Sequence, residues 1–299
     1  MARVIQDVGE QPLVLHSNVR EPLERMSFLQ RALVLAELAM VSYNDEAEAR
    51  RAAEAIGFDE AELFDNDGSQ AYRFRNQNDC VVTCRGTEPN EWNDLKADAN
   101  ASLAVLETIG GVHSGFNREV DDLWPLLEGI LKGNDQPVWF CGHSLGGAMA
   151  TICAYRCKRS SLTTDPRELH TFGSPRVGNK RYLRHAPIEH FRWVNNNDIV
   201  TRVPPPWMGY RHGGDEIYLD RNGNIRRLTG VLRSRDRWRG FLAGLARGQL
   251  DPLADHSIHH YVDHIWNAAQ AEDRGVDRGQ REVREEDIVI RHAEGEPTS

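Results

Sequence analysis

The chain has 299 residues, 40% of them hydrophobic, and a formal net charge of −9 at pH 7. This length and apolar content suffice for one large globular domain with a sizeable core. The acidic balance argues against broad nucleic-acid binding, because neutralising phosphates requires a dominant basic field. No stretch approaches the roughly 20 apolar residues of a membrane-spanning helix.

The N-terminal residues and the cysteines both bear on the compartment. The first residues, MARVIQDVGEQP, have no apolar run behind Arg3, whereas a secretory signal needs one. The five cysteines are an odd number, and several lie in apolar runs, where free thiols behave as small hydrophobes. We therefore expect a cytoplasmic protein without a disulfide framework. Cys153 and Cys157 lie four apart but lack the second pair of a zinc site, so we expect no metal and no cofactor.

Helices and strands alternate along most of the chain. Apolar residues at helical spacing predict helices over residues 23–41, 45–56, 116–133, 145–158 and 257–269. Short apolar runs predict strands over residues 72–75, 80–84, 138–141, 169–172 and 191–194. This alternation indicates an α/β fold with a mostly parallel central sheet and helices on both faces.

The pattern changes after the three prolines at 204–206. Residues 216–220 and 224–228 predict a hairpin that turns at Arg221-Asn222-Gly223. We find no internal repeat and no low-complexity linker, and we therefore predict one domain over residues 1–270. Residues 271–299 form a charged tail with few apolar residues, which we expect to be mobile.

The most informative motif is Gly142-His143-Ser144-Leu145-Gly146. It fits the G-x-S-x-G nucleophile elbow, and it follows a predicted strand and precedes a predicted helix, as that motif requires. Glycines two residues on either side of the serine let the backbones crowd together at the turn. The helix start also presents free N–H groups to a developing oxyanion, and the N–H of Leu145 is the first of them. An ordinary capping serine in a glycine-rich turn is the alternative.

With this motif the chain resembles the class 3 lipase family over roughly residues 30 to 270. Four blocks occur in that family's order: Arg85-Gly86-Thr87, His113 to Phe116, Gly142 to Gly147, and Asn197 to Val200. The resemblance implies an α/β-hydrolase fold and a second oxyanion contact from Thr87. It also implies that residues 88–95 form a short lid, with Trp92 as its apolar contact.

The acid should follow the nucleophile, because this fold orders its residues as serine, acid, histidine. Asp198 follows the strand at 191–194 and matches the family block, so we predict it as the acid, although an Asx-turn residue is the plain alternative. Asp215 and Asp220 are less suitable, because they lie in or beside the predicted hairpin.

His256 is our predicted base. It precedes the last helix and matches the family's histidine followed by an apolar residue and a tyrosine. A neutral imidazole there takes the Ser144 proton, while Asp198 fixes the tautomer. His259 is the second candidate, and a zinc site at 256, 260 and 264 lacks the H-E-x-x-H pattern.

Three further polar residues are interpreted as structural. His113 precedes a helix and is taken as its polar start. His143 lies inside the elbow and is assigned to packing or orientation. Ser174 precedes Pro175, which supplies no N–H to an oxyanion, so Ser174 is assigned to a turn.

A serine nucleophile predicts acyl transfer without defining the acyl donor. The resemblance implies carboxylic esters, with acylglycerols first and phospholipid sn-1 esters (phospholipase A1) or short-chain esters next. The Arg-rich stretch 233–245 interleaves arginines with Trp238, Phe241 and Leu242 and predicts a contact with anionic lipid, or else a solvated face. A non-catalytic ligand-binding relative, a peptidase and a thioesterase remain as alternatives.

Overall fold

The fold is described from a computed structural model. The structure describes residues 3–5, 13–86, 103–106, 110–162, 164–226 and 254–275. Its main sheet has eight strands in the order β12-β11-β10-β9-β8-β5-β4-β3. The five central strands, from β11 to β5, are parallel, whereas β4, β3 and β12 are antiparallel to their neighbours at the two edges.

The strands are β3 (Glu60–Asn66), β4 (Ser69–Arg75), β5 (Cys80–Cys84), β8 (Val138–His143), β9 (Pro166–Phe172), β10 (Glu189–Asn195), β11 (Asp215–Leu219) and β12 (Ile225–Arg226). Two small antiparallel pairs stand apart from this sheet: β1 (Arg3–Ile5) with β2 (Leu13–Leu15), and β6 (Leu103–Leu106) with β7 (Gly110–His113).

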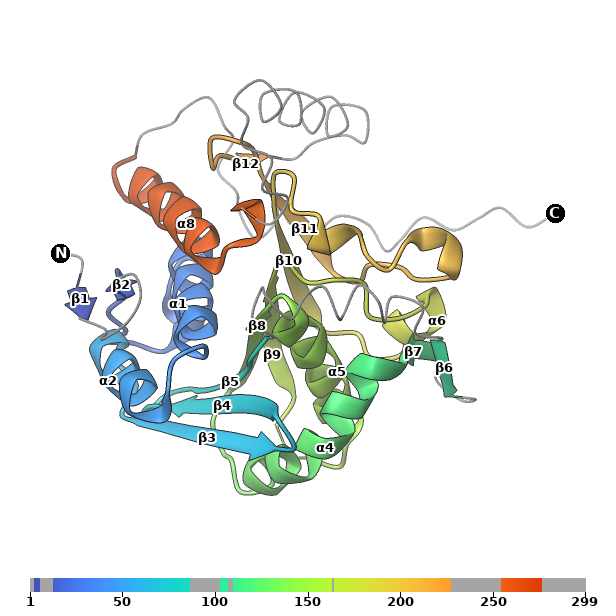
Figure 1. Ribbon diagram of the computed structural model, residues 1–299. Helices are drawn as coiled ribbons and strands as arrows, with labels where there is room; N and C mark the ends of the chain where they lie inside the picture. The colour runs from blue at the N-terminus through green and yellow to red at the C-terminus, as the bar shows by residue number, and fades with distance from the viewer. Residues whose placement is uncertain are drawn as a thin grey trace.

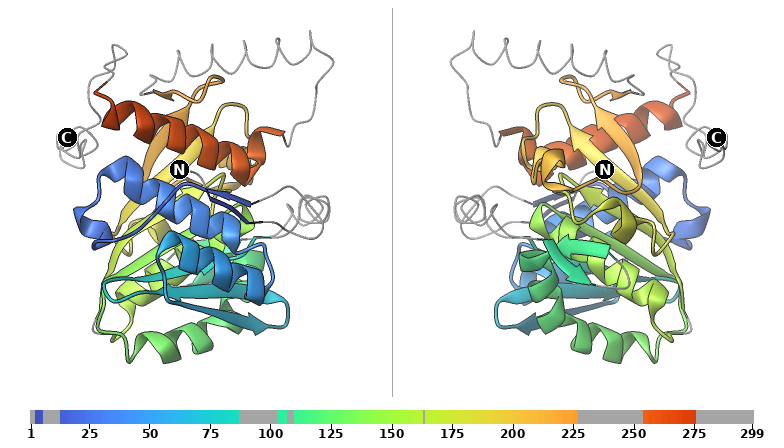
Figure 2. Two further views of the ribbon diagram at one scale, coloured as in Figure 1. Left: turned by 90° about the vertical axis from the view of Figure 1, so that its left-hand side faces the viewer. Right: turned by 90° about the vertical axis from the view of Figure 1, so that its right-hand side faces the viewer.

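Helices cover both faces of the sheet. On one face lie α1 (Phe28–Val41), α2 (Glu46–Ile56) and α8 (Ile258–Asp273), and on the other lie α4 (Ser114–Leu131) and α5 (Leu145–Arg159). Figures 1 and 2 show α1 and α8 packed side by side, although they come from opposite ends of the chain. The short helix α6 (Lys180–Leu183) and the 3-10 turns η1 (Leu23–Arg25), η3 (Val200–Arg202), η4 (Pro206–Met208) and η5 (Ala254–His256) complete the described elements.

The alternation of side chains along the central strands produces two cores. On β8, Trp139 and Cys141 face the α1 side, and Phe140 between them faces α5. All these side chains are almost fully buried. A strand buried on both faces is read as a continuous apolar run, which is why β5 and β8 were visible in the sequence.

Several boundaries differ from the predicted ones. The first helix begins at Phe28, because Ser27 caps it in a reciprocal capping box with Gln30. The strand β3 was missed altogether. The hairpin of β11 and β12 is present, and Asp220 holds its turn by accepting from the N–H groups of Asn222 and Asn224. The last helix continues to Asp273, three residues beyond the expected domain limit, and residues 276–299 of the expected tail lie outside the described residues. The division at residue 270 remains a prediction.

Candidate active site

The turn between β8 and α5 places Ser144 at the carboxyl edge of the parallel strands. Ser144 has φ 58° and ψ −129°, a conformation that is costly for a residue with a side chain. The turn requires glycine on both sides: a Cβ added to Gly142 would lie 2.4 Å from the Gly146 carbonyl oxygen, and one on Gly146 would lie 2.2 Å from the Cys84 carbonyl oxygen. The strained, glycine-flanked serine has the geometry of a nucleophile elbow.

Ser144, His256 and Asp198 form one hydrogen-bonded chain. Ser144 Oγ lies 2.8 Å from His256 Nε2, and His256 Nδ1 lies 3.0 Å from Asp198 Oδ2. All three residues are buried, with 3%, 6% and 1% of their surfaces exposed. The structure thus brings together the three predicted residues, from segments 58 and 112 residues apart along the chain.

Asp198 accepts further hydrogen bonds that hold its carboxylate. Its Oδ2 accepts from the Tyr261 hydroxyl at 2.6 Å, and its Oδ1 accepts from the Val200 N–H at 2.9 Å. Burial and the neighbouring Asp198 raise the pKa of Tyr261 well above its usual value, so the phenol keeps its proton and remains a donor. These donors satisfy both carboxylate oxygens in a buried place, where a polar group without a partner would be unfavourable.

Asp255 ties the loop of the acid to the loop of the base. Its carboxylate accepts from Asn196 Nδ2 at 3.0 Å and from the Asn197 N–H at 3.2 Å. Its backbone carbonyl accepts from Asn195 Nδ2 at 2.9 Å. The three residues that precede Asp198 are therefore fixed to the residue before His256.

His143 holds the backbone of His256. Burial and the nearby His256 imidazole lower the pKa of His143 well below its usual value, so its ring is neutral. His143 Nε2 lies 2.6 Å from the His256 carbonyl oxygen and must donate to it, which leaves Nδ1 to accept from the Tyr43 hydroxyl at 2.9 Å. The two imidazole rings also lie 4.6 Å apart between centroids. These contacts agree with the packing or orienting role that was predicted for His143.

Gly173 provides the room for the acid and the base. It follows β9 with φ +62°, and a Cβ added there would lie 2.7 Å from Asp198 Oδ2 and 2.9 Å from His256 Nδ1. Neither the backbone conformation nor the space admits a larger residue.

Only part of the predicted oxyanion site is described. Leu145 is the first residue of α5, so its N–H has no carbonyl partner one turn earlier and lies at the positive end of the helix. It adjoins Ser144 directly, as an oxyanion donor must. Thr87, Trp92 and the predicted lid at 88–95 lie outside the described residues.

The rejected candidates are occupied elsewhere. His259 is exposed on α8, and no hydrogen bond joins it to Ser144 or Asp198. Asp220 bonds Arg226 at 2.9 Å. Ser174 Oγ donates to the Pro175 carbonyl, and His113 caps α4 by accepting from the Phe116 N–H.

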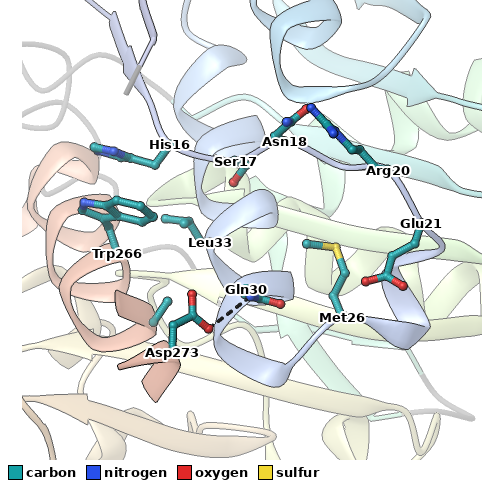
Figure 3. Close-up of a pocket in the computed structure, with 11 residues that line it drawn as sticks. His16, Ser17, Asn18, Arg20, Glu21, Met26, Gln30, Leu33, Trp266 and Asp273 are labelled. Atoms are coloured by element: carbon teal, nitrogen blue, oxygen red, sulfur yellow. Dashed lines mark hydrogen bonds between the residues drawn. The ribbon is translucent and has the colours of Figure 1, made fainter. Parts of the chain in front are cut away.

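One cavity among the described residues lies away from this site. A cavity of about 470 Å³ lies between the segment after β2, α1 and the C-terminal half of α8. Figure 3 shows His16 stacked on Trp266 at its rim and Gln30 bonded to Asp273 across it. None of the residues that line this cavity belongs to the hydrogen-bonded chain of Ser144, His256 and Asp198. Over the described ranges there is also no group of three or more residues suited to hold a metal ion, and no described helix is long and apolar enough to cross a membrane.

Three residues support the site without having been predicted to do so: Tyr43, Asp255 and Tyr261. Each reaches the site from a separate element and acts through another residue, so no local pattern indicates its role. Tyr261 belongs to the motif around His256, but its bond to Asp198 forms only in the fold.

The comparisons with known proteins agree with this geometry. Residues 81–208 match the family model of class 3 lipases. A secreted mono- and diacylglycerol lipase of Fusarium solani is 33% identical over 118 residues, which are 37% of this chain and 34% of that protein. A lipase of Rhizomucor miehei is 38% identical over 137 residues, which are 42% of this chain and 38% of that protein. The predicted resemblance to class 3 lipases is confirmed.

The fold agrees with solved structures. The triacylglyceride lipase of Rhizomucor miehei superposes with a TM-score of 0.56 at 22% identity, covering 66% of this chain and 82% of that structure. The lipase II of Rhizopus niveus superposes with a TM-score of 0.53 at 24% identity, covering 64% of this chain and 80% of that structure. The predicted α/β-hydrolase fold is confirmed.

The comparisons also bear on length and compartment. The chain spans between 18% and 47% of the length of the first curated relatives that it matches. The expectation of a cytoplasmic protein is wrong, because the relative from Fusarium solani is a secreted lipase. The described cysteines are buried free thiols, which pack as small hydrophobes and carry no information about the compartment.

Proposed function

Starting from a class 3 lipase segment at residues 81–208, we propose that the protein is a serine carboxylic-ester hydrolase that acts on lipid esters. The observation that carries this proposal is the hydrogen-bonded chain from Ser144 Oγ through His256 to Asp198, with distances of 2.8 and 3.0 Å. Acylglycerols are the proposed substrates, as in the names of the related fungal lipases.

The first half of the reaction acylates Ser144. Ser144 Oγ attacks the ester carbonyl carbon while His256 Nε2 takes the hydroxyl proton, and the carbonyl oxygen becomes an oxyanion. The N–H of Leu145 donates to this oxyanion, and Thr87 is proposed as the second donor. The tetrahedral intermediate then expels the alcohol oxygen, which receives the proton from His256. Asp198 stabilises the imidazolium and keeps Nε2 directed at the serine.

The second half releases the acid. Water gives a proton to His256 Nε2 and attacks the acyl carbon, and the second tetrahedral intermediate expels Ser144 Oγ, which regains its proton from His256. One ester bond and one water are consumed, and one alcohol and one carboxylic acid are formed. These proton transfers require no cofactor.

Covalent labelling tests the nucleophile. A fluorescent alkyl phosphonate should label the wild-type protein at Ser144, because that hydroxyl has a base and an adjacent N–H donor. Ser144→Ala should abolish labelling, whereas Ser174→Ala should retain it as the matched control. Full labelling of Ser144→Ala would exclude the assignment.

A substrate panel tests the reaction class. Glycerol esters and p-nitrophenyl esters of increasing chain length should be hydrolysed, and peptides and thioesters should not. Preference for phospholipid sn-1 esters would make the protein a phospholipase A1, and preference for short dispersed esters would make it an esterase. Labelling without turnover of any ester would indicate a non-catalytic relative. Contact of the Arg-rich stretch 233–245 with anionic lipid remains a separate proposal.

A further inference from the structure

Two exposed apolar side chains stand next to each other on the loop that follows the acid. Trp207 is 86% exposed and Met208 is 36% exposed, both on the turn η4. Among the described residues, only one other large apolar side chain, Leu126 on α4, is comparably exposed. An isolated exposed apolar residue is ordinary, but a tryptophan with most of its surface in water at a loop tip is not.

The loop holds this tip firmly. The Met208 N–H donates to the Pro205 carbonyl, and the Gly209 N–H donates to the Pro206 carbonyl. Gly209 has φ 91°, so it reverses the chain in a conformation that favours glycine. Arg211 Nη1 donates to the Pro206 carbonyl at 2.7 Å. The exposed position of Trp207 is therefore built into the loop, and little further ordering is needed when it binds a partner.

The surroundings of the tip are basic on an acidic protein. The segments 175–184 and 199–213 are joined where the Arg211 N–H donates to the Gly178 carbonyl. Together these two segments contain no Asp or Glu. Their Lys and Arg residues are Arg176, Lys180, Arg181, Arg184, Arg202 and Arg211. All of these except the half-buried Arg176 are exposed, although the whole chain has a net charge of −9.

The two segments leave the sheet at its catalytic edge. Segment 175–184 follows β9 and Gly173, and segment 199–213 follows β10 and Asp198. In Figure 1, α6 and the gold turns between β10 and β11 lie beside each other. Ser144 also lies at this edge, directly after β8. A surface bound to these segments would therefore meet the side of the molecule that carries the candidate nucleophile.

We propose that the tip Trp207–Met208, together with the basic residues around it, docks the protein on an anionic lipid surface. Tryptophan favours the lipid–water interface, where its apolar ring enters the headgroup region. Lysine and arginine next to such an anchor add electrostatic attraction to anionic headgroups. A protein partner is less well matched, because two neighbouring side chains are a small apolar area for a stable protein interface. Nucleic acid is a poor match as a partner, because the chain has a net charge of −9.

This inference goes beyond the proposed function and can be tested apart from it. Binding is measured by flotation with vesicles of phosphatidylglycerol and phosphatidylcholine, in the Ser144→Ala background so that no lipid is consumed. Trp207→Ser should weaken binding to anionic vesicles at least about tenfold, because the apolar ring that enters the headgroup region is lost. Leu126→Ser on α4 is the matched control and should bind as the parent does. Thermal unfolding establishes that each variant is folded.

Charge variants test the basic part. Arg202→Gln with Arg211→Gln should weaken binding about fivefold for each charge at low salt, and the effect should shrink as salt rises. Arg50→Gln with Arg51→Gln, on α2, is the control. In the catalytically intact protein, Trp207→Ser should lower the ratio of emulsified to dispersed ester turnover.

Equal vesicle binding by the parent, Trp207→Ser and Leu126→Ser would overturn the proposal. So would absence of vesicle binding combined with a Trp207-dependent dimer, since the tip would then serve a second copy of this chain. Vesicle binding without ester turnover would preserve the docking surface and reject the proposed function. Turnover of dispersed esters without vesicle binding would support the proposed function and reject the docking surface.

Discussion

The part of the chain that the structure describes contains two buried pairs of a carboxylate and an imidazole, and they differ in the group that the second imidazole nitrogen contacts. In the first, His256 bonds Asp198 and directs its other nitrogen at the Ser144 hydroxyl. In the second, His170 Nε2 bonds Glu168 at 2.8 Å, and Trp193 Nε1 donates to His170 Nδ1 at 3.3 Å. The acceptor nitrogen of His170 is thus occupied by an indole N–H, which has no nucleophilic role.

The carboxylates differ as well. Glu168 also bonds Arg31, at 2.8 and 3.0 Å, so its charge is neutralised within the core. Burial alone would raise the pKa of Glu168, but the His170 hydrogen bond and the Arg31 charge outweigh it and lower that pKa. Burial lowers the pKa of His170. A buried acid–imidazole pair therefore indicates a base only when the remaining nitrogen faces a hydroxyl at the edge of the sheet.

Replacing each histidine by alanine should give the largest difference between the two pairs, because only His256 is expected to take part in catalysis. His256→Ala should lower kcat on a p-nitrophenyl ester by about three to four orders of magnitude, as loss of a triad member does. His170→Ala should leave kcat within about tenfold but reduce the free energy of unfolding by roughly 1–3 kcal/mol, because Glu168 and the Trp193 N–H lose a partner. Equal losses of kcat in the two folded variants would show that the pairs do not differ in function.

Removal of the buried guanidinium should have the next largest effect. Arg31→Met should reduce the free energy of unfolding by about 3–5 kcal/mol, because it removes the guanidinium that neutralises the Glu168 charge in the core and leaves only the His170 hydrogen bond. Arg50→Met is the control, since its pair with Glu46 is more than half exposed on both side chains and should change stability by at most about 0.5 kcal/mol. Urea unfolding measures both, and similar values would argue that the Arg31 pair is solvated.

Glu37 on α1 should give stability a pH dependence of the opposite sign to that of an ordinary paired carboxylate. Burial raises its pKa to about 7, although it accepts from the His16 and Ser17 N–H groups. The folded state therefore binds a proton that the unfolded state releases, and the stabilisation is complete below the unfolded pKa of about 4.5 and lost as pH rises through about 7.

The expected loss is at most about 3.5 kcal/mol, at about 1.4 kcal/mol for each pKa unit between 4.5 and about 7. Glu37→Gln should flatten this part of the stability profile, measured by urea unfolding between pH 4.5 and 8. Glu54→Gln, exposed on α2, should leave the profile unchanged. A wild-type profile that rises through this range relative to Glu37→Gln would contradict the prediction.

Tyr261→Phe should give the smallest effect on catalysis, and the buried Asn195 N–H also loses its acceptor at 3.0 Å. Asp198 would lose the donor at 2.6 Å but keep His256 and the Val200 N–H. We expect kcat to fall by about ten- to a hundredfold, in line with about 1.5–3 kcal/mol for a hydrogen bond to a charged group. KM should stay unchanged because Tyr261 acts through Asp198. Tyr155→Phe, which loses only a 3.4 Å bond to the Leu183 carbonyl, is the control. A rise in KM without a fall in kcat would argue against a positioning role.

Local sequence patterns predicted the elements that are buried on both faces. The runs at β5 and β8 and the elbow at Ser144 are each continuous in the chain, so a short stretch of sequence contains the whole pattern that identifies each of them. The strand β3 escaped because Glu60–Asn66 has the composition of a helix and becomes a strand only by pairing with β4. The small pair of β6 and β7 was missed as well.

In the candidate site, too, residues with a local sequence pattern were predicted and residues that depend on tertiary contacts were not. Ser144, Asp198 and His256 each follow an element end or motif that the sequence displays, and the structure brings them together. Tyr43 and Asp255 gain their roles only through tertiary contacts, with His143 and with the Asn196–Asn197 backbone and side chains. A single sequence contains no signal for such partners. The roles of Thr87, Trp92 and the stretch 233–245 remain predictions, since these residues lie outside the described ranges.

The glycine at position 173 has a consequence for protein engineering. Its missing side chain is the space in which the acid and the base meet, so the 2.7 Å and 2.9 Å clearances leave no volume for even one methyl group. A library that randomises the positions around the site to alter substrate preference should therefore keep residue 173 constant. Substitutions at residue 173 should give inactive variants, although the residue itself takes no part in the chemistry.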